Sequence, residues 1–186
     1  ITDANGCTYP VPVTITEPNL ITVLANPQNI SCNGGNDGSI TITASGGTPL
    51  YEFSNDGGTT WFGPSTSHPF TGLSAGNHVI DVRDANLCYL TPTLTVILSE
   101  PSALTVSYTI TSNVICKGDS TGSLTINASG GTPPYTYDLT GPSPSTQNTQ
   151  QVNNPFFAGL SAGLYTCTIT DANSCVKIIN NIQITE

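Results

Sequence analysis

Four segments in the first half of the sequence recur in the second half. The matches are 32–39 with 116–123 and 45–49 with 129–133, both offset by 84 residues, then 72–76 with 159–163 and 84–88 with 171–175, both offset by 87. A small insertion in the second copy accounts for the change of offset. Self-similarity at one period is typical of tandem structural repeats, because each copy of the motif set specifies the same small unit.

A third, truncated copy begins the chain, since residues 3–7 and 15–18 match 84–88 and 98–101. We therefore expect the sequence to be an excerpt from a longer array. The predicted parts are a C-terminal fragment of a preceding repeat (1–18), a first complete repeat (19–101) and a second complete repeat (102–186).

Apolar residues alternate with Thr, Ser or Gln along many short segments, for example at Ile40, Ile42 and Ala44. Alternation with period two is typical of strands with one buried face. Glycine, proline and Asn/Asp clusters separate these segments, and no stretch shows a sustained helical period. This predicts an all-β fold in which each repeat is an Ig-like β-sandwich of about seven antiparallel strands. The Glu-Pro pairs at 17–18 and 100–101 leave short, stiff joints, which favour repeats arranged end to end.

Each complete repeat carries one cysteine near its start and one near its end. Cys32 and Cys88 occupy these places in the first repeat, and Cys116 and Cys175 occupy them in the second. A unit of this size has a marginal hydrophobic core, so a covalent link would matter. We predict the disulfides Cys32–Cys88 and Cys116–Cys175, each worth about 4 kcal/mol in the chain-entropy model.

The two remaining cysteines are predicted to be free thiols. Cys7 would have its partner upstream, and Cys167 aligns with Ile80 on the buried face of a strand, where a thiol acts as a small hydrophobic side chain. Disulfides in every repeat indicate an oxidising compartment. The protein is therefore expected to be exported and extracellular, at the cell surface.

The charge balance excludes one class of partner. Twelve acidic residues face three basic ones, giving a net charge of −9, so a polyanion such as a nucleic acid would be repelled. The apolar stretches are only a few residues long, so no membrane insertion by this segment is expected. His68 and His78 do not recur in the second repeat, and no nucleophile–base set does, so we predict a protein that is not an enzyme.

The segment Ser54–Trp61 resembles the Asp-box of sialidases. That motif is a hairpin device in which the aspartate caps the turn and the tryptophan packs behind it, and the second repeat lacks it. We interpret it as structural. An exposed Trp61 could instead stack on a sugar ring, so it is also a candidate for carbohydrate stacking.

Recurring oxygen ligands suggest a calcium site, because Asp84, Asn86 and Glu100 have counterparts in the other copies. Gathered where repeats meet, they could bind Ca²⁺ and stiffen the joint, although turn formation also explains Asp84 and Asn86. Asp37 and Asp119 are alternative ligands. No other cofactor is expected. Ser120 lies in a three-residue segment, 119–121, that looks like an O-glycan acceptor of Bacteroidota, and is a candidate for glycan attachment.

The series of motifs at 31–40, 44–49, 72–76, 84–88 and 99–101 resembles the SprB-type repeat, and the second repeat carries the same series. Leu50, where the family usually has proline, and Cys167 are departures. Leu87 and Ser174 replace the glycine that Gly6 provides, so either the turn differs there or the cost of a left-handed conformation is tolerated.

SprB-type repeats occur in tandem in very large surface proteins of Bacteroidota, among them gliding-motility adhesins exported by the type 9 secretion system. The resemblance implies a stalk or filament segment of a secreted adhesin that gives extended reach and mechanical stability. Its implied partners are adjacent repeats of the same chain, and neighbouring filament chains or surface glycans. The alternative is a carbohydrate-binding module of a secreted glycosidase, with Trp61, Tyr51 or Tyr135 as the stacking platform.

Overall fold

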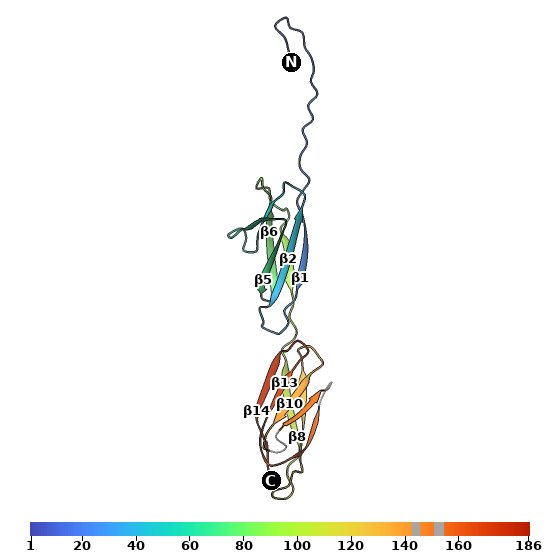
Figure 1. Ribbon diagram of the computed structural model, residues 1–186, viewed down its shortest axis with the longest axis vertical. Coiled ribbons are helices and arrows are strands. Elements are labelled where there is room, and N and C mark those ends of the chain that lie inside the picture. Colours follow the sequence, from blue (N-terminus) through green and yellow to red (C-terminus); the bar gives the residue numbers. More distant parts are fainter. Residues whose placement is uncertain (143–145, 151–154) are drawn as a thin grey trace. The chain divides into compact units, whose positions relative to one another are not determined.

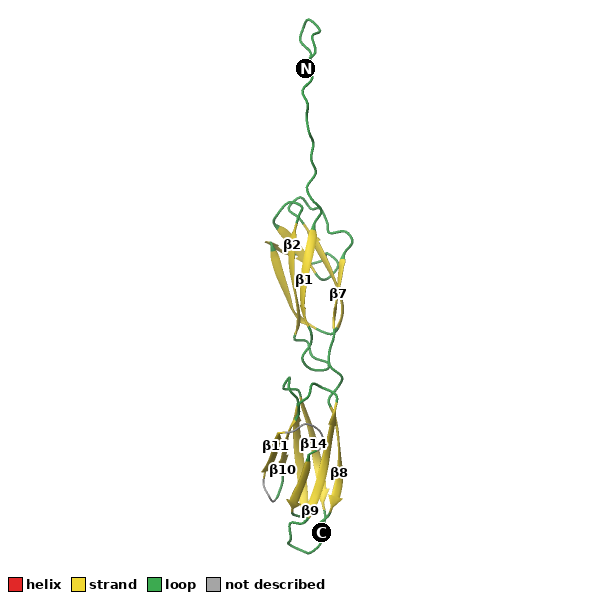
Figure 2. Cartoon of the chain, turned by 90° about the vertical axis from the view of Figure 1, so that its right-hand side faces the viewer, coloured by secondary structure: helices red, strands yellow, loops and turns green. Residues whose placement is uncertain are grey.

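The computed structural model describes residues 1–142, 146–150 and 155–186. Within these ranges the regular secondary structure consists of β-strands (Figures 1 and 2). No helix in the described residues is therefore long and apolar enough to cross a bilayer. The all-β prediction is confirmed.

Among the described residues, each complete repeat contains seven strands. The first repeat contains β1 (Thr22–Gln28), β2 (Gly38–Ser45), β3 (Tyr51–Ser54), β4 (Phe62–Ser65), β5 (Ser67–Leu73), β6 (Gly76–Arg83) and β7 (Leu94–Leu98). The second repeat contains β8 (Thr105–Ser112), β9 (Gly122–Ser129), β10 (Thr136–Thr140), β11 (Thr146–Gln150), β12 (Phe156–Leu160), β13 (Gly163–Thr170) and β14 (Val176–Ile184).

The two repeats have the same sheet topology. A three-stranded sheet has the order β1-β2-β5 in the first repeat and β8-β9-β12 in the second. A four-stranded sheet has the order β4-β3-β6-β7 in the first and β11-β10-β13-β14 in the second. The pairings of β9 with β8 and β12, and of β13 with β10 and β14, are antiparallel. The predicted two-sheet sandwich is thus present in both copies.

Alternating burial along the strands explains why these segments form half-buried sheets. In β2, Ile40 and Ile42 are fully buried while the threonines beside them remain more accessible, and Leu124 and Ile126 repeat this pattern in β9. Cys167 lies in β13 within the buried core of the second repeat. That core is lined by side chains from both sheets: Leu124, Ile126, Tyr137, Leu139, Phe157, Leu160, Tyr165, Cys167, Ile169, Ile182 and Ile184.

A buried tyrosine holds the glycine-rich turn that follows β2 or β9. The hydroxyl of Tyr51 donates a hydrogen bond to the carbonyl oxygen of Gly46 (2.5 Å), and that of Tyr135 donates to Gly130 (2.6 Å). Because these contacts recur at equivalent positions, they belong to the fold of the repeat. They also fix the turn that carries the Gly-Gly-Thr part of the sequence motif, which forms one wall of the site described below.

The backbone groups into two compact units. The first comprises residues 1–26, 41–69 and 79–95, and the second comprises 27–40, 70–78 and 96–186. The second unit therefore includes the loop between β1 and β2 together with all strands from β8 onward. The repeat boundaries expected after residues 18 and 101 are not tested by this division and remain predictions.

Candidate functional site

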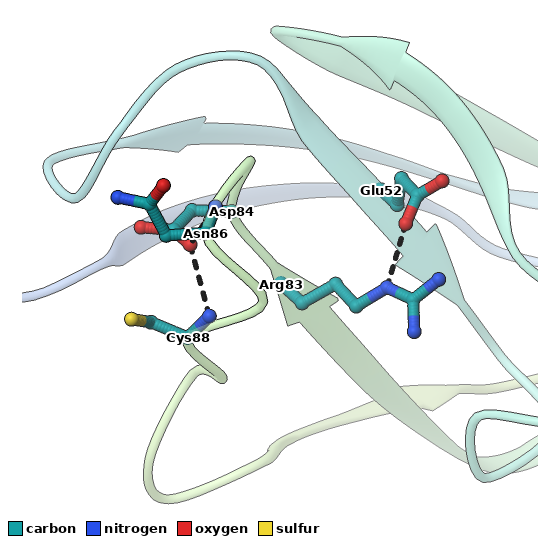
Figure 3. Close-up of polar contacts among 5 residues, drawn as sticks. All are labelled: Glu52, Arg83, Asp84, Asn86 and Cys88. Atoms are coloured by element: carbon teal, nitrogen blue, oxygen red, sulfur yellow. Dashed lines mark hydrogen bonds and ion pairs between the residues drawn. The ribbon is translucent and has the colours of Figure 1, made fainter.

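The motif Asp-Ala-Asn-x-Cys forms the same turn wherever it occurs, and we call this the cysteine turn (residues 3–7, 84–88 and 171–175). The Asp84 carboxylate organises the copy that follows β6. Its Oδ1 atom accepts hydrogen bonds from the backbone N–H of Asn86 at 2.9 Å and from that of Cys88, also at 2.9 Å (Figure 3). Its Oδ2 atom accepts from the N–H of Thr48, also at 2.9 Å. A short side chain bonding its own following backbone is the reason aspartate is favoured in such turns.

Asp171 makes the same three contacts in the second repeat. It accepts from the N–H groups of Asn173, Cys175 and Thr132 at 2.9, 2.9 and 2.8 Å. Asp84 and Asp171 are only 3% and 5% exposed, so these hydrogen bonds satisfy carboxylates that water hardly reaches. The backbone N–H of Thr48, followed by that of Cys88, holds the pKa of Asp84 below its usual value.

A glycine of the Gly-Gly-Thr motif leaves space for the aspartate of the cysteine turn in each repeat. At Gly131, whose φ is +59°, a Cβ atom would lie 2.6 Å from Oδ2 of Asp171, and at Gly47 it would lie 2.8 Å from Oδ2 of Asp84. Any side chain there would displace the carboxylate. The Gly-Gly-Thr and Asp-Ala-Asn-x-Cys motifs are therefore two halves of one structure.

The fourth residue of the cysteine turn has a left-handed backbone in every copy. The φ angle is 84° at Gly6, 62° at Leu87 and 66° at Ser174. Of the two alternatives expected from sequence, the turn is thus unchanged and the cost of a non-glycine residue is tolerated. That cost is about 1 kcal/mol per position.

The disulfide of this protein joins the two repeats, and the predicted pairs Cys32–Cys88 and Cys116–Cys175 are wrong. Cys32 is bonded to Cys175, with their Cα atoms 5.7 Å apart. Cys88 and Cys116 are exposed free thiols. The link therefore runs from the loop between β1 and β2 to the cysteine turn between β13 and β14.

Strand register in the second repeat shows why Cys116 and Cys175 cannot pair. Cys116 precedes β9 in a loop tied to the end of β14 by the hydrogen bond from the N–H of Val114 to the oxygen of Thr185 (2.9 Å). Cys175 lies at the other end of the β13–β14 hairpin. The length of β13 separates the two by about 25 Å, whereas a disulfide requires Cα atoms within about 7 Å.

The other two cysteines behave as predicted. Cys7 is an exposed free thiol, and Cys167 is a buried one. Burial raises the pKa of the Cys167 thiol to about 12, so it is unreactive at neutral pH. Its place among aliphatic and aromatic side chains confirms its role as a small hydrophobic residue.

Asn173 adds hydrogen bonds beside the disulfide. Its Nδ2 atom donates to the backbone oxygen of Ser31 (2.9 Å) and to Oγ1 of Thr132 (3.1 Å). Ser31 directly precedes Cys32, so the amide and the disulfide act on the same short segment. The sequence motifs did not predict this role. The recurrence of asparagine in all three cysteine turns is the signal that could have shown it.

The segment that carries the first cysteine of each repeat is the cysteine loop (residues 31–37 and 115–121). In the first repeat its Gly34 N–H donates to the Glu100 carboxylate at 2.6 Å, and the Asn33 side chain donates to the same carboxylate at 2.9 Å. In the second repeat the N–H of Gly118 donates to Glu186 at 3.3 Å. The glutamate near the end of each repeat, Glu100 or Glu186, therefore anchors the cysteine loop.

The predicted calcium ligands form two sets of contacts. Asp84 and Asn86 share one cysteine turn, while Glu100 binds amide groups of the cysteine loop. Asp37 accepts a hydrogen bond from the N–H of Ser31 (3.1 Å). Among the described residues no three His, Cys, Asp or Glu side chains gather in a metal-binding arrangement. Calcium binding, including its alternative ligand Asp119, stays a prediction, and melting temperatures measured with calcium and with EDTA decide it.

The segment Ser54–Trp61 is a capped turn, which confirms the structural interpretation. Oδ1 of Asp56 accepts from the N–H groups of Thr59 and Thr60 at 3.0 and 2.9 Å. The hydrogen bond from Thr60, followed by that from the Ser54 hydroxyl, lowers the pKa of Asp56 to about 2.

Trp61 is half-buried behind this turn. The guanidinium carbon of Arg83 lies 4.1 Å from the centre of its ring, a cation–π distance. Glu52 holds Arg83 through an ion pair of 2.6 Å (Figure 3). One face of the indole is therefore occupied, and sugar stacking on Trp61 remains untested. Ser120 is exposed in the second cysteine loop, where glycan attachment also remains a prediction.

Two antiparallel sheets per repeat, with seven strands in one order, define an all-β protein of the Ig-like sandwich class. The model of the SprB repeat matches this chain at two places, residues 24–60 and 108–144. The family resemblance of the sequence motifs is confirmed.

Comparison with solved structures gives distant likenesses. The three N-terminal domains of the Highly Immunogenic Outer Capsid protein (Hoc) of bacteriophage RB49 match at 13% identity and a TM-score of 0.44, covering 88% of this chain and 58% of that one. The C-terminal 282-residue fragment of intimin, solved with the intimin-binding domain of its translocated receptor, matches at 17% and 0.46, covering 89% and 64%. This chain thus spans less than two thirds of either structure. Comparison with curated proteins gave no match.

Proposed function

We propose that this chain is a structural, non-enzymatic segment of a large secreted surface adhesin, in which SprB repeats arranged end to end form a stalk or filament. The observation that carries the proposal is the Cys32–Cys175 disulfide between consecutive repeats. A covalent link between repeats serves a protein whose task is to transmit force. The SprB repeats support an extracellular location and, by family resemblance, export by the type 9 secretion system.

The position of the disulfide supports a mechanical role because it provides a short covalent path through the protein. Tension applied at the two ends passes along residues 1–32, crosses the disulfide and continues along 175–186. The residues between the two cysteines lie in a closed loop whose backbone cannot be extended while the bond is intact. Most of both sandwiches is thereby protected against extension.

Small-angle scattering tests the end-to-end arrangement. A single globule of this length would have a radius of gyration of about 16 Å, whereas two sandwiches joined end to end are expected to exceed about 20 Å. A value near 16 Å contradicts the stalk. Glycan-array binding that is lost in Trp61→Ala, with Phe62→Ala as a neighbouring aromatic control, would support the carbohydrate-binding alternative instead.

A further inference from the structure

We propose that Cys116 and Cys88 are the two halves of further disulfides of the Cys32–Cys175 kind, so that each joint in a longer array of these repeats is covalent. Cys116 is the counterpart of Cys32, and Cys88 is the counterpart of Cys175. The partner of Cys116 is the cysteine turn of a following SprB repeat. The partner of Cys88 is the cysteine loop of a preceding one.

The second cysteine loop already has the conformation of the bonded one. Gly35 N–H donates to the oxygen of Cys32 at 2.9 Å, and Asp119 N–H donates to that of Cys116 at 3.0 Å. The start of the loop is capped at the same place by different side chains. Ser31 N–H donates to Asp37 at 3.1 Å, and Ile115 N–H donates to Thr121 at 3.0 Å. The exposed thiol of Cys116 is thus held in the same kind of loop as Cys32.

The cysteine turn at residues 84–88 likewise matches the bonded one at residues 171–175. Asp84 makes the three backbone contacts that Asp171 makes, and Asn86 donates to Oγ1 of Thr48 (2.9 Å) as Asn173 donates to Thr132. Asn173 also donates to a backbone oxygen beside Cys32. Because that acceptor is a main-chain atom, any SprB cysteine loop offers it, including the loop in which Ile115 replaces Ser31.

Forming such a bond removes two electrons from the two cysteines. An oxidant of the disulfide class, for example oxidised glutathione, accepts these electrons. The thiolate of Cys116 attacks one sulfur of the oxidant, which breaks its S–S bond and releases one thiolate. The cysteine of the following repeat, as its thiolate, attacks the mixed disulfide at the Cys116 sulfur, forms the bond between repeats and releases the second thiolate. Two cysteines are oxidised, and the oxidant leaves as two thiols that carry the two protons.

The test extends the full chain by one further pair of repeats. Residues 18–186 are placed after Glu186, so that the new joint reads Glu-Pro as at Glu100–Pro101. The first copy carries Cys88→Ser, and the second copy carries Cys116→Ser. The extended protein therefore keeps one Cys116, in the first copy, and one Cys88, in the second copy. Peptide mapping of the oxidised monomer without reduction is expected to show these two joined, with Cys116 lost from the alkylated thiols. A matched control with Cys88→Ser in both copies keeps Cys116 alkylated.

Three results overturn the inference: Cys116 bonded to Cys175, Cys116 still fully alkylated, or the absence of Cys32–Cys175 from the same map. The inference depends on the equivalence of the repeats and not on the stalk role. A failure here therefore leaves the scattering test of the proposed function intact.

Discussion

The length to which the protein can be pulled depends on which cysteines are joined. Cys32 and Cys175 are 143 residues apart in sequence. Extended chain spans about 3.5 Å per residue, so the closed loop hides about 500 Å of contour length. With the bond intact, only the residues outside the loop can extend, which gives about 150 Å between residues 1 and 186.

Single-molecule force spectroscopy with handles at the two termini measures this length directly. The oxidised protein is expected to stop near 150 Å, and the reduced protein or Cys175→Ser is expected to reach about 650 Å. Cys88→Ser is the matched control, because Cys88 is free, and it should behave as the wild type.

Two outcomes would refute the reasoning. An oxidised protein that extends to about 650 Å has no disulfide closing the loop. A limit near 250 Å would correspond to one bridge inside each repeat, the pairing that the sequence first suggested.

Further predictions concern the cysteine turn and the capped turn that contains Asp56. Asp171→Ala removes the acceptor of three backbone N–H groups and is expected to cost about 3 kcal/mol in urea unfolding, while the exposed Asp119→Ala stays within about 0.5 kcal/mol. Ser174→Gly should stabilise the protein by about 0.5 to 1 kcal/mol, because φ is 66° there; a loss of stability would contradict the strain argument. Folding lowers the pKa of Asp84 below its usual value of 3.8. The ionised carboxylate therefore contributes fully to the free energy of unfolding above pH 3.8, and this contribution is lost as the pH falls below that value. Asp56, with a pKa of about 2, acts in the same direction, so calorimetry should show the melting temperature falling from pH 4 to 2, and a constant value would contradict this.

Sequence alone predicted the repeats, the strands and the family, because alternation and motif recurrence are local signals. It failed on the disulfide because pairing depends on which end of the sandwich each loop occupies. Five strands, β9 to β13, separate Cys116 from Cys175. Consecutive antiparallel strands reverse direction, so an odd number of them places the two loops at opposite ends. Counting strands would have excluded a bridge within the repeat.

The hydrogen bonds of the site also include some that the sequence predicted and some that it could not predict. The aspartate of the cysteine turn was predicted to have turn duties, and it does. The requirement for glycine at Gly131 was not foreseen, because it arises from a contact with Asp171, 40 positions later in the chain. Nor could the sequence show that Glu100 would bind the loop at Gly34, since no local pattern links them.

The opposite placement of the two cysteines gives every repeat a head and a tail. A repeat offers one kind of half-bond forward and the other kind backward, and the two kinds are not interchangeable. Contacts of this heterologous type join unlike surfaces, so within one chain they follow the order of the repeats in a single direction. A disulfide of this kind therefore requires the cysteine loop of one repeat to face the cysteine turn of the next, and two like ends brought together would not form it.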